Sequence, residues 1–269
     1  YAAGNFTLTS DILAEGVARA TRRGWRSLGI GLRSGVGGDG VGADCLVWFD
    51  DGLGGGPALY AGGDFTEAVN TTDEEDVYER IAAVRVARWR ANEWTALGDG
   101  LPSRVRALSE HDGGLYAGGD FAEVVAFWED PDWLPLGALP VTAGGLLQAM
   151  ISFGGSLWIC GEWPLLHGGT AVVFRWDGAA WYDQSPAGWL GQVCDFAVAD
   201  TDGTGNRLFA VGSNSVANPF LVWTGAAWAA LGTILNPTAD VNARLVRWPR
   251  GSFANDRLIG IGHFQIGAD

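Results

Sequence analysis

The stretch LYAGGDFTEA, residues 59–68, returns as LYAGGDFAEV at residues 115–124, almost letter for letter. More degenerate copies run along the rest of the chain: YAAGNF at 1–6, LWICGEW at 157–163, LFAVGSN at 208–214 and LIGIGHF at 258–264. All six copies share one glycine, at Gly4, Gly63, Gly119, Gly161, Gly212 and Gly262. Their spacing of roughly 40 to 60 residues is typical of the blades of a β-propeller.

A second pattern alternates with the first and consists of two tryptophans separated by four residues. The pairs are Trp89 with Trp94, Trp128 with Trp133, Trp176 with Trp181, and Trp223 with Trp228. Near the N-terminus, Ala20 stands in the leading position before Trp25. Turn residues between the partners, such as Asp177-Gly178, favour a tight hairpin. We therefore predict that each pair faces across two antiparallel strands.

A further apolar stretch lies between each tryptophan pair and the next LYAGG-like run. These stretches are DCLVWFD from residue 44, VRALSE from 105, LQAMISF from 147, VCDFAVA from 193 and NARLVRW from 242. Each unit thus contains four strands: a (VRALSE-like), b (LYAGGDF-like), c (ending in the first tryptophan) and d (opening with the second). Four antiparallel strands in a unit of about 50 residues are typical of a propeller blade.

The predicted fold class is all-β: a single-domain β-propeller, residues 1–269, of four-stranded antiparallel blades. Four complete units run from about residue 43 to 235, the N-terminus supplies b, c and d, and the C-terminus supplies a and b. We expect the termini to share one blade and to close the ring as a latch that leaves no open sheet edge. This gives five blades. The surplus b strand leaves six blades, or a truncated longer array, as the alternative.

Charge and hydropathy exclude two classes of partner. The net charge of −14 repels phosphate backbones, so we expect no nucleic acid. No run of about 18 apolar residues is present, so we expect no membrane span. The oligomeric state is not decided by these residues.

Cys45, Cys160 and Cys194 each lie within an apolar, strand-like run. We interpret them as buried free thiols. A disulfide between Cys160 and Cys194 is the alternative.

The a-b-c-d order, the Gly-Gly that ends strand b and the tryptophan that opens strand d resemble the kelch-type propeller repeat. The combination of FDDGLGGGPALYAGGDF (49–65) with VARWRANEWTALGDGL (86–101) is similar to repeats in secreted and surface proteins of planctomycetes and other environmental bacteria. The resemblance covers essentially the whole chain. It implies an extracellular or cell-surface location, with ligands at the b-to-c and d-to-a connections, the mouth of the channel. It implies no particular activity.

The first candidate site at this mouth follows the shared glycine. Short polar residues stand directly after it and aromatic residues come next; the candidates are Asp64, Asp120, Glu162 and His263, with Phe65, Phe121 and Trp163. Polar groups beside aromatic rings are what glycan recognition uses. The alternative is that each polar side chain satisfies N–H groups of its own loop while the aromatic ring packs between blades.

The second candidate site is the channel wall. Alignment of the a strands places five residues at one equivalent position: Asp44, Arg106, Gln148, Cys194 and Asn242. Such a mixed set argues against a glycosidase, which needs converging carboxylates. Asp44 and Asp195 are the carboxylates that an enzyme of that kind would use.

We predict no cofactor, with Ca²⁺ as the one ion to consider. The insertion TEAVNTTDEEDVYER carries the carboxylates of residues 73–76, and DTDGTGN carries Asp200, Asp202 and Asn206. We interpret the first as a solvated acidic loop and the second as a turn. The Gly-rich residues 30–44 read as a flexible d-to-a loop. The three histidines do not have the spacing of a metal site.

The functional prediction is a non-catalytic binding propeller, outside the cell, that recognises a glycan or a protein through its channel-mouth face. A polysaccharide-acting enzyme is one alternative. A structural module of a larger surface protein is the other.

Overall fold

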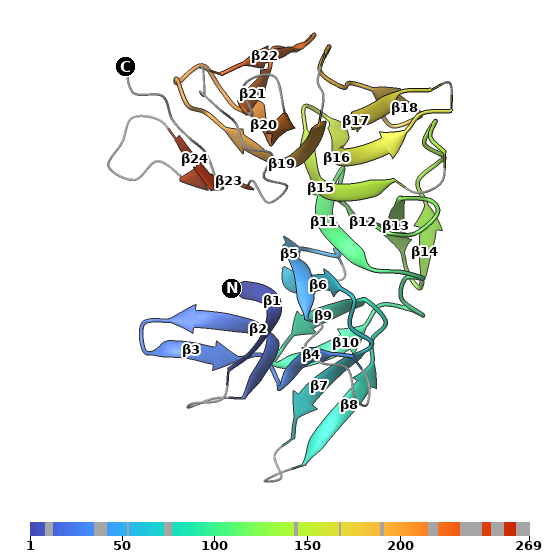
Figure 1. Ribbon diagram of the computed structural model, residues 1–269. Coiled ribbons are helices and arrows are strands. Elements are labelled where there is room, and N and C mark those ends of the chain that lie inside the picture. Colours follow the sequence, from blue (N-terminus) through green and yellow to red (C-terminus); the bar gives the residue numbers. More distant parts are fainter. Residues whose placement is uncertain are drawn as a thin grey trace. The chain divides into compact units, whose positions relative to one another are not determined.

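The computed structural model describes residues 1–8, 13–34, 42–52, 54–72, 77–142, 145–166, 168–188, 191–214, 220–231, 244–248 and 256–261 (Figure 1). The secondary structure of these residues is all β. Accordingly, none of them belongs to a helix that could cross a membrane. The chain divides into two compact units, unit 1 (Tyr1–Ala138) and unit 2 (Leu139–Asp269). The single-domain assignment stays a prediction.

Unit 1 contains three sheets. Its strands are β1 (Ala2–Leu8), β2 (Ala14–Thr21), β3 (Gly24–Ser27), β4 (Gly31–Arg33), β5 (Ala43–Phe49), β6 (Ala58–Gly63), β7 (Glu67–Thr71), β8 (Tyr78–Ala82), β9 (Val86–Arg90), β10 (Glu93–Ala96), β11 (Val105–His111), β12 (Gly114–Gly119), β13 (Val125–Glu129) and β14 (Asp132–Pro135). Two sheets are four-stranded, with the orders β10-β9-β6-β5 and β11-β12-β13-β14. The third has six strands in the order β1-β2-β4-β7-β8, with β3 paired to β2.

Unit 2 contains two four-stranded sheets and one two-stranded sheet. Its strands are β15 (Leu146–Phe153), β16 (Ser156–Pro164), β17 (Thr170–Trp176), β18 (Trp181–Asp183), β19 (Gly191–Ala199), β20 (Arg207–Asn214), β21 (Phe220–Trp223), β22 (Trp228–Ala230), β23 (Arg244–Trp248) and β24 (Arg257–Ile261). The sheets are β15-β16-β17-β18, β19-β20-β21-β22 and β23-β24. The four complete a-b-c-d units are therefore confirmed as four antiparallel sheets. The partial units are β1, β2 and β3 at the N-terminus and β23 and β24 at the C-terminus.

Strand a carries a β-bulge at the same place in all four complete sheets. In the first, Ala43 pairs with Gly63 and Cys45 with Gly62, so Asp44 is the extra residue. The extra residue in the other three sheets is Arg106, Gln148 and Cys194. The predicted equivalence is thus confirmed for four of the five positions, and Asn242 lies outside the described residues. A bulge at a fixed place redirects one side chain per sheet.

The shared glycine is required by the backbone that lies against this bulge. A methyl group on Gly63 would lie 2.4 Å from the carbonyl oxygen of Gly42, and one on Gly119 would lie 2.1 Å from that of Arg104. On Gly161 the corresponding distance, to the oxygen of Leu146, is 1.9 Å. The recurrent glycine of LYAGGDF therefore allows strand a to approach strand b, as expected for glycine in a strand.

The predicted tryptophan pairs are confirmed. Each pair is in register across strands c and d, and the ring centroids lie 5.1 to 5.4 Å apart in all four complete sheets. In the N-terminal sheet, Ala20 faces Trp25 as the sequence predicts.

The indole of strand d also joins neighbouring sheets. Trp94 Nε1 donates to the carbonyl oxygen of Leu28, and Trp228 Nε1 donates to that of Gln184, both at 2.7 Å. Each acceptor lies three residues after the strand-d tryptophan of the preceding sheet. In the β11–β14 sheet the corresponding Trp133 Nε1 is buried, without a hydrogen-bond partner among the described residues.

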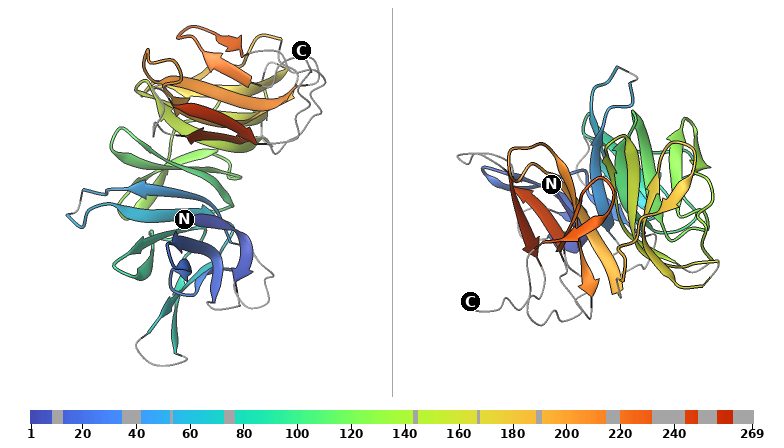
Figure 2. Two further views of the ribbon diagram at one scale, coloured as in Figure 1. Left: turned by 90° about the vertical axis from the view of Figure 1, so that its left-hand side faces the viewer. Right: turned by 90° about the horizontal axis from the view of Figure 1, so that it is seen from above.

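The inserted segment after LYAGGDF is not the loop that the sequence suggested. Its residues form the β7–β8 hairpin, which projects from unit 1 in teal (Figure 2, left). Strand β7 pairs with β4, so part of the expected flexible 30–44 loop is also a strand. Asn70 fixes the hairpin, because its buried amide accepts from Trp94 N at 2.7 Å and donates to Trp94 O at 3.1 Å. Residues 73–76 lie outside the described part of the chain.

Candidate functional site

In unit 1 the b-to-c and d-to-a connections form what we call the loop face, and the predicted Asp44 lies there. Arg104, from the d-to-a connection before β11, donates to both carboxylate oxygens of Asp44 at 2.6 Å. This two-pronged geometry is the strong form of an arginine–carboxylate pair. The pKa of Arg104 is raised, chiefly by this hydrogen bond and further by the charges of Asp44, Asp120 and Asp64.

The two aspartates of the LYAGGDF repeats are also held by arginines. Arg106 Nε donates to Asp120 Oδ1 at 2.6 Å, and Arg85 Nε lies 3.4 Å from Asp64 Oδ1. Arg85 additionally donates to the carbonyl oxygen of Leu101 at 3.0 Å. The alternative in which these carboxylates cap N–H groups of their own loops therefore does not describe these contacts. With Asp44 and Arg104, three carboxylates balance three guanidinium groups.

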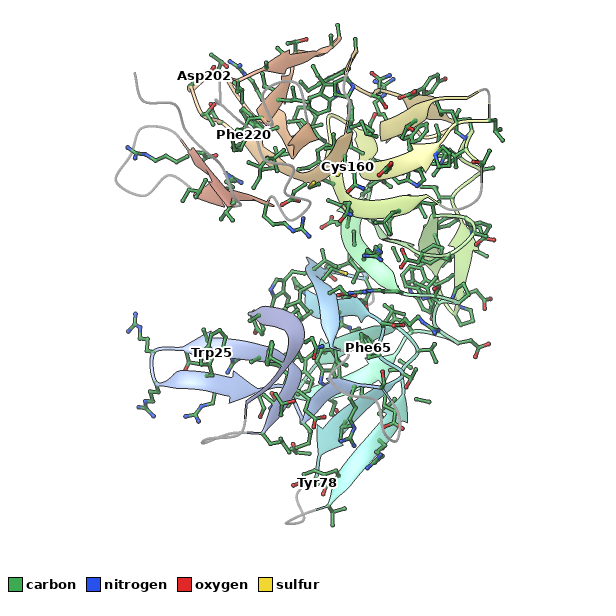
Figure 3. All side chains as sticks on the ribbon, in the orientation of Figure 1. Trp25, Phe65, Tyr78, Cys160, Asp202 and Phe220 are labelled. Carbon is green, nitrogen blue, oxygen red and sulfur yellow. The ribbon has the colours of Figure 1, made fainter. Side chains whose placement is uncertain are left out.

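The aromatic candidates lie mainly in the core. Phe65 and Trp163 are fully buried, and Phe65 is labelled among the side chains inside unit 1 in Figure 3. Trp163 packs edge-on against Phe174 with centroids 5.6 Å apart. Phe121 is also buried, but it lines a cavity. Phe65 and Trp163 therefore serve packing, whereas Phe121 forms a wall of a possible binding site.

In unit 2 the equivalent positions carry neutral partners. Glu162 accepts a hydrogen bond of 2.5 Å from the Gln192 amide, and Gln192 occupies the position that Arg104 holds in unit 1. Gln148 is half-buried at its bulge. His263, like Asn242, lies outside the described residues.

Asp195 anchors strand β23. Its carboxylate accepts from Leu245 N at 3.0 Å and from Phe196 N at 2.9 Å. Burial raises its pKa, and these two hydrogen bonds partly offset the rise. The acidic group therefore has a structural role in joining β19 to β23.

The cysteines are free thiols, as predicted. Cys160, labelled in Figure 3, and Cys194 are buried, while Cys45 is half-buried instead of buried as expected. Burial raises the pKa of the Cys45 and Cys160 thiols. Thiols with raised pKa values are poor nucleophiles and poor metal ligands at neutral pH.

The DTDGTGN segment is a turn, as predicted. Asp200 Oδ1 accepts from Gly203 N at 2.7 Å, and Asp202 Oδ1 accepts from Thr204 N at 3.1 Å. Asp202 also pairs with Arg207. Such side-chain-to-backbone bonds are those of Asx turns. Among the residues that the structure describes, no three His, Cys, Asp or Glu side chains form a group that could hold a metal ion.

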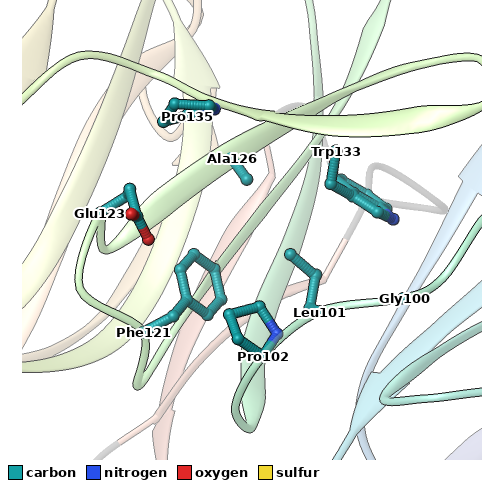
Figure 4. A pocket seen from close by; sticks show the side chains of 8 residues that line it. All are labelled: Gly100, Leu101, Pro102, Phe121, Glu123, Ala126, Trp133 and Pro135. Atoms are coloured by element: carbon teal, nitrogen blue, oxygen red, sulfur yellow. The ribbon is translucent and has the colours of Figure 1, made fainter.

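A cavity of about 190 Å³ opens on the loop face of unit 1. It is lined by Gly100, Leu101, Pro102, Phe121, Glu123, Ala126, Trp133 and Pro135. Figure 4 shows Phe121, Pro102 and Leu101 side by side, with Glu123 near Phe121 and Trp133 beyond Leu101. Sequence reasoning identified only Phe121 in this set. The signal for Glu123 was present, because it aligns with Glu67 in the paired LYAGGDF repeats.

Comparison with known proteins gives one weak structural likeness to report. No family model matches the chain, and no curated protein matches it. The extracellular domain of a putative hybrid two-component system from B. thetaiotaomicron matches 80% of this chain at 10% identity, with a TM-score of 0.34. The match spans 37% of that chain's length.

Proposed function

We propose that the chain is a non-catalytic, extracellular binding module that recognises a glycan or a protein through its loop face. The observation that carries this proposal is the pairing of Asp44, Asp64 and Asp120 with arginines. A glycosidase needs one carboxylate that donates a proton and another that is free to attack or to activate water. Carboxylates tied to guanidinium groups favour a rigid, charge-balanced recognition surface instead.

We further propose that the sheets belong to a five-bladed ring, in which the N-terminal and C-terminal strands share one blade. The indole-to-carbonyl bonds of Trp94 and Trp228 support this, because the same rule applied to Trp25 requires a preceding sheet. Trp25 is 46% exposed, and the residue that the repeat assigns as its acceptor, Leu231, is 39% exposed. Closure would cover both. Six blades remain the alternative.

The enzyme alternative rests on Asp44 and Asp195. Asp44 is bound by Arg104, and Asp195 is bound by two main-chain N–H groups. If any activity on polysaccharide is found, the double variant Asp44→Asn, Asp195→Asn tests it, and unchanged activity removes this assignment. A structural module without its own ligand is the third reading.

Glycan arrays and a pull-down from the native host test the binding role. A ligand at micromolar concentration is expected, and the variant Arg106→Ala should weaken its binding. The control is Glu129→Ala, an exposed residue at the c-to-d end of β13, away from the loop face. No ligand of either class, or a ligand insensitive to loop-face variants, would overturn the proposal.

A further inference from the structure

The cavity in unit 1 occupies the position that strand β7 fills in the preceding repeat. The two segments from tryptophan through the d-to-a connection align without a gap, so Gly100–Pro102 corresponds to β4. Likewise Phe121 corresponds to Phe65, Glu123 to Glu67 and Trp133 to Trp94. In the earlier repeat β7 pairs with β4, and Asn70 clamps Trp94.

The later repeat keeps the binding groups but lacks the strand. Its b-to-c connection runs from Asp120 to Val124, directly from β12 into β13. Trp94 is 1% exposed under β7, whereas Trp133 is half-buried and lines the cavity. The difference is therefore a missing segment of chain over an otherwise equivalent surface.

The edge of β14 presents the same main-chain groups that Asn70 binds in β10. In both hairpins the strand-d tryptophan is the second pair from a two-residue turn. Alternate pairs of an antiparallel ladder turn their N–H and C=O groups outward, so those of Trp133 point away from β13 as those of Trp94 point away from β9. β14 is the terminal strand of its sheet.

We propose that this cavity binds an extended peptide segment of a protein partner, which adds alongside Gly100–Pro102 as β7 adds to β4. A side-chain amide of that segment, from Asn or Gln, clamps the main chain of Trp133. This deepens the proposed binding role and rests on it. Strand addition to an open edge is an established way to bind peptides, in which main-chain bonds give affinity and pockets give specificity.

The chemistry of the rim selects the segment further. Glu123 is exposed, and its carboxylate makes no hydrogen bond or ion pair with the described residues, unlike Asp44, Asp64 and Asp120 on the same face. In the earlier repeat, the equivalent Glu67 pairs with Arg33 and Arg80. A basic residue in the incoming segment, close to the amide, would pair with Glu123. The cavity volume of about 190 Å³ suits one amide side chain.

The chain supplies its own probe, the β7 peptide TEAVNTT, residues 66–72. The acetylated, amidated peptide is titrated onto the intact chain by isothermal calorimetry and by NMR shifts of indole N–H groups. We expect binding in which the peptide with Asn70→Ala is about tenfold weaker, since one amide clamp is lost. A peptide with Glu67→Arg should bind more tightly, through Glu123.

Two protein variants define the site. Glu123→Trp fills the rim from an exposed position and should abolish binding, while Glu129→Trp on the opposite end of β13 should not; circular dichroism checks both folds. No binding at millimolar peptide, or binding that neither Asn70→Ala nor Glu123→Trp changes, overturns the inference. Binding of methyl N-acetylglucosaminide instead, sensitive to Glu123→Trp, overturns the peptide assignment. In that case, or if pull-down ligands respond only to Arg106→Ala, the loop-face binding role itself stands.

Discussion

Arg104 in unit 1 and Gln192 in unit 2 occupy the same place, directly before the a-strand residue that pairs with the shared glycine. Both side chains reach a carboxylate of the preceding sheet. Arg104 forms a charged, two-pronged pair with Asp44, whereas Gln192 forms one neutral bond with Glu162. The repeat thus determines where a side chain is placed, through the bulge and the glycine. It does not determine the charge, and this leaves the two units free to differ in function.

The largest effect should come from the feature that both units share. Gly119→Ala and Gly161→Ala each place a methyl group about 2 Å from a carbonyl oxygen, so each should lower the free energy of unfolding by about 3 kcal/mol. Chemical denaturation measures both. The matched control is Gly24→Ala, which meets no atom within 4 Å and has a φ of +106°, and should lose about 1 kcal/mol from backbone strain alone. Unequal losses at Gly119 and Gly161 would contradict a common backbone.

The second effect should be confined to unit 1, since the β7–β8 insertion has no counterpart among the described residues of unit 2. Asn70→Ala removes both hydrogen bonds to Trp94 and leaves two buried main-chain groups unsatisfied. We expect a loss of about 2 kcal/mol in unfolding free energy. Hydrogen exchange at β7 and β8 should rise with it. The exposed Asn5→Ala is the control, and an Asn70→Ala variant as stable as the control would show that the hairpin is held by other contacts.

The sequence was sufficient for the features that repetition makes visible. The register of the Trp89–Trp94 pair, the glycine of strand b and the bulge at Asp44 all follow from aligning copies, because each copy must satisfy the same backbone geometry. The β7–β8 hairpin could not be read this way, since it occurs once. Asn70, which fixes it, looks like an ordinary loop residue until Trp94 is placed beside it.

The pairing of carboxylates with arginines was equally hidden. Arg85, Arg104 and Arg106 lie at different offsets from their partners Asp64, Asp44 and Asp120. Arg104 reaches across sheets, so its contact depends on how neighbouring sheets pack and not on any spacing within one repeat. For the same reason the cavity at Phe121 was not predicted: it results from the absence of a segment, and one copy alone does not reveal that.

A smaller effect should come from converting one unit into the other. Arg104→Gln gives unit 1 the residue of unit 2, and we expect it to lose about 1 kcal/mol, since the Asp44 pair is partly exposed and screened by solvent. The loss should shrink in 1 M salt, where charges are screened over about 3 Å. Gln192→Ala is the comparison and should show no such salt dependence. A salt-independent loss at Arg104 would mean that its packing, and not its charge, matters.

The smallest effect should be a dependence on pH that differs in sign between two aspartates of unit 2. Burial raises the pKa of Asp195 above its ordinary 3.8, so its contribution to stability is complete below that value and is lost as the pH rises through the raised pKa. Main-chain N–H groups of Ala180 and Ala179 lower the pKa of Asp177, so its contribution is present above 3.8 and is lost as the pH falls. Denaturation between pH 3 and pH 7 should therefore show Asp195→Asn gaining stability relative to the parent as the pH rises, and Asp177→Asn gaining as it falls. Parallel curves for the two variants would mean that Asp195 is not buried against β23, and that the anchor between β19 and β23 lies elsewhere.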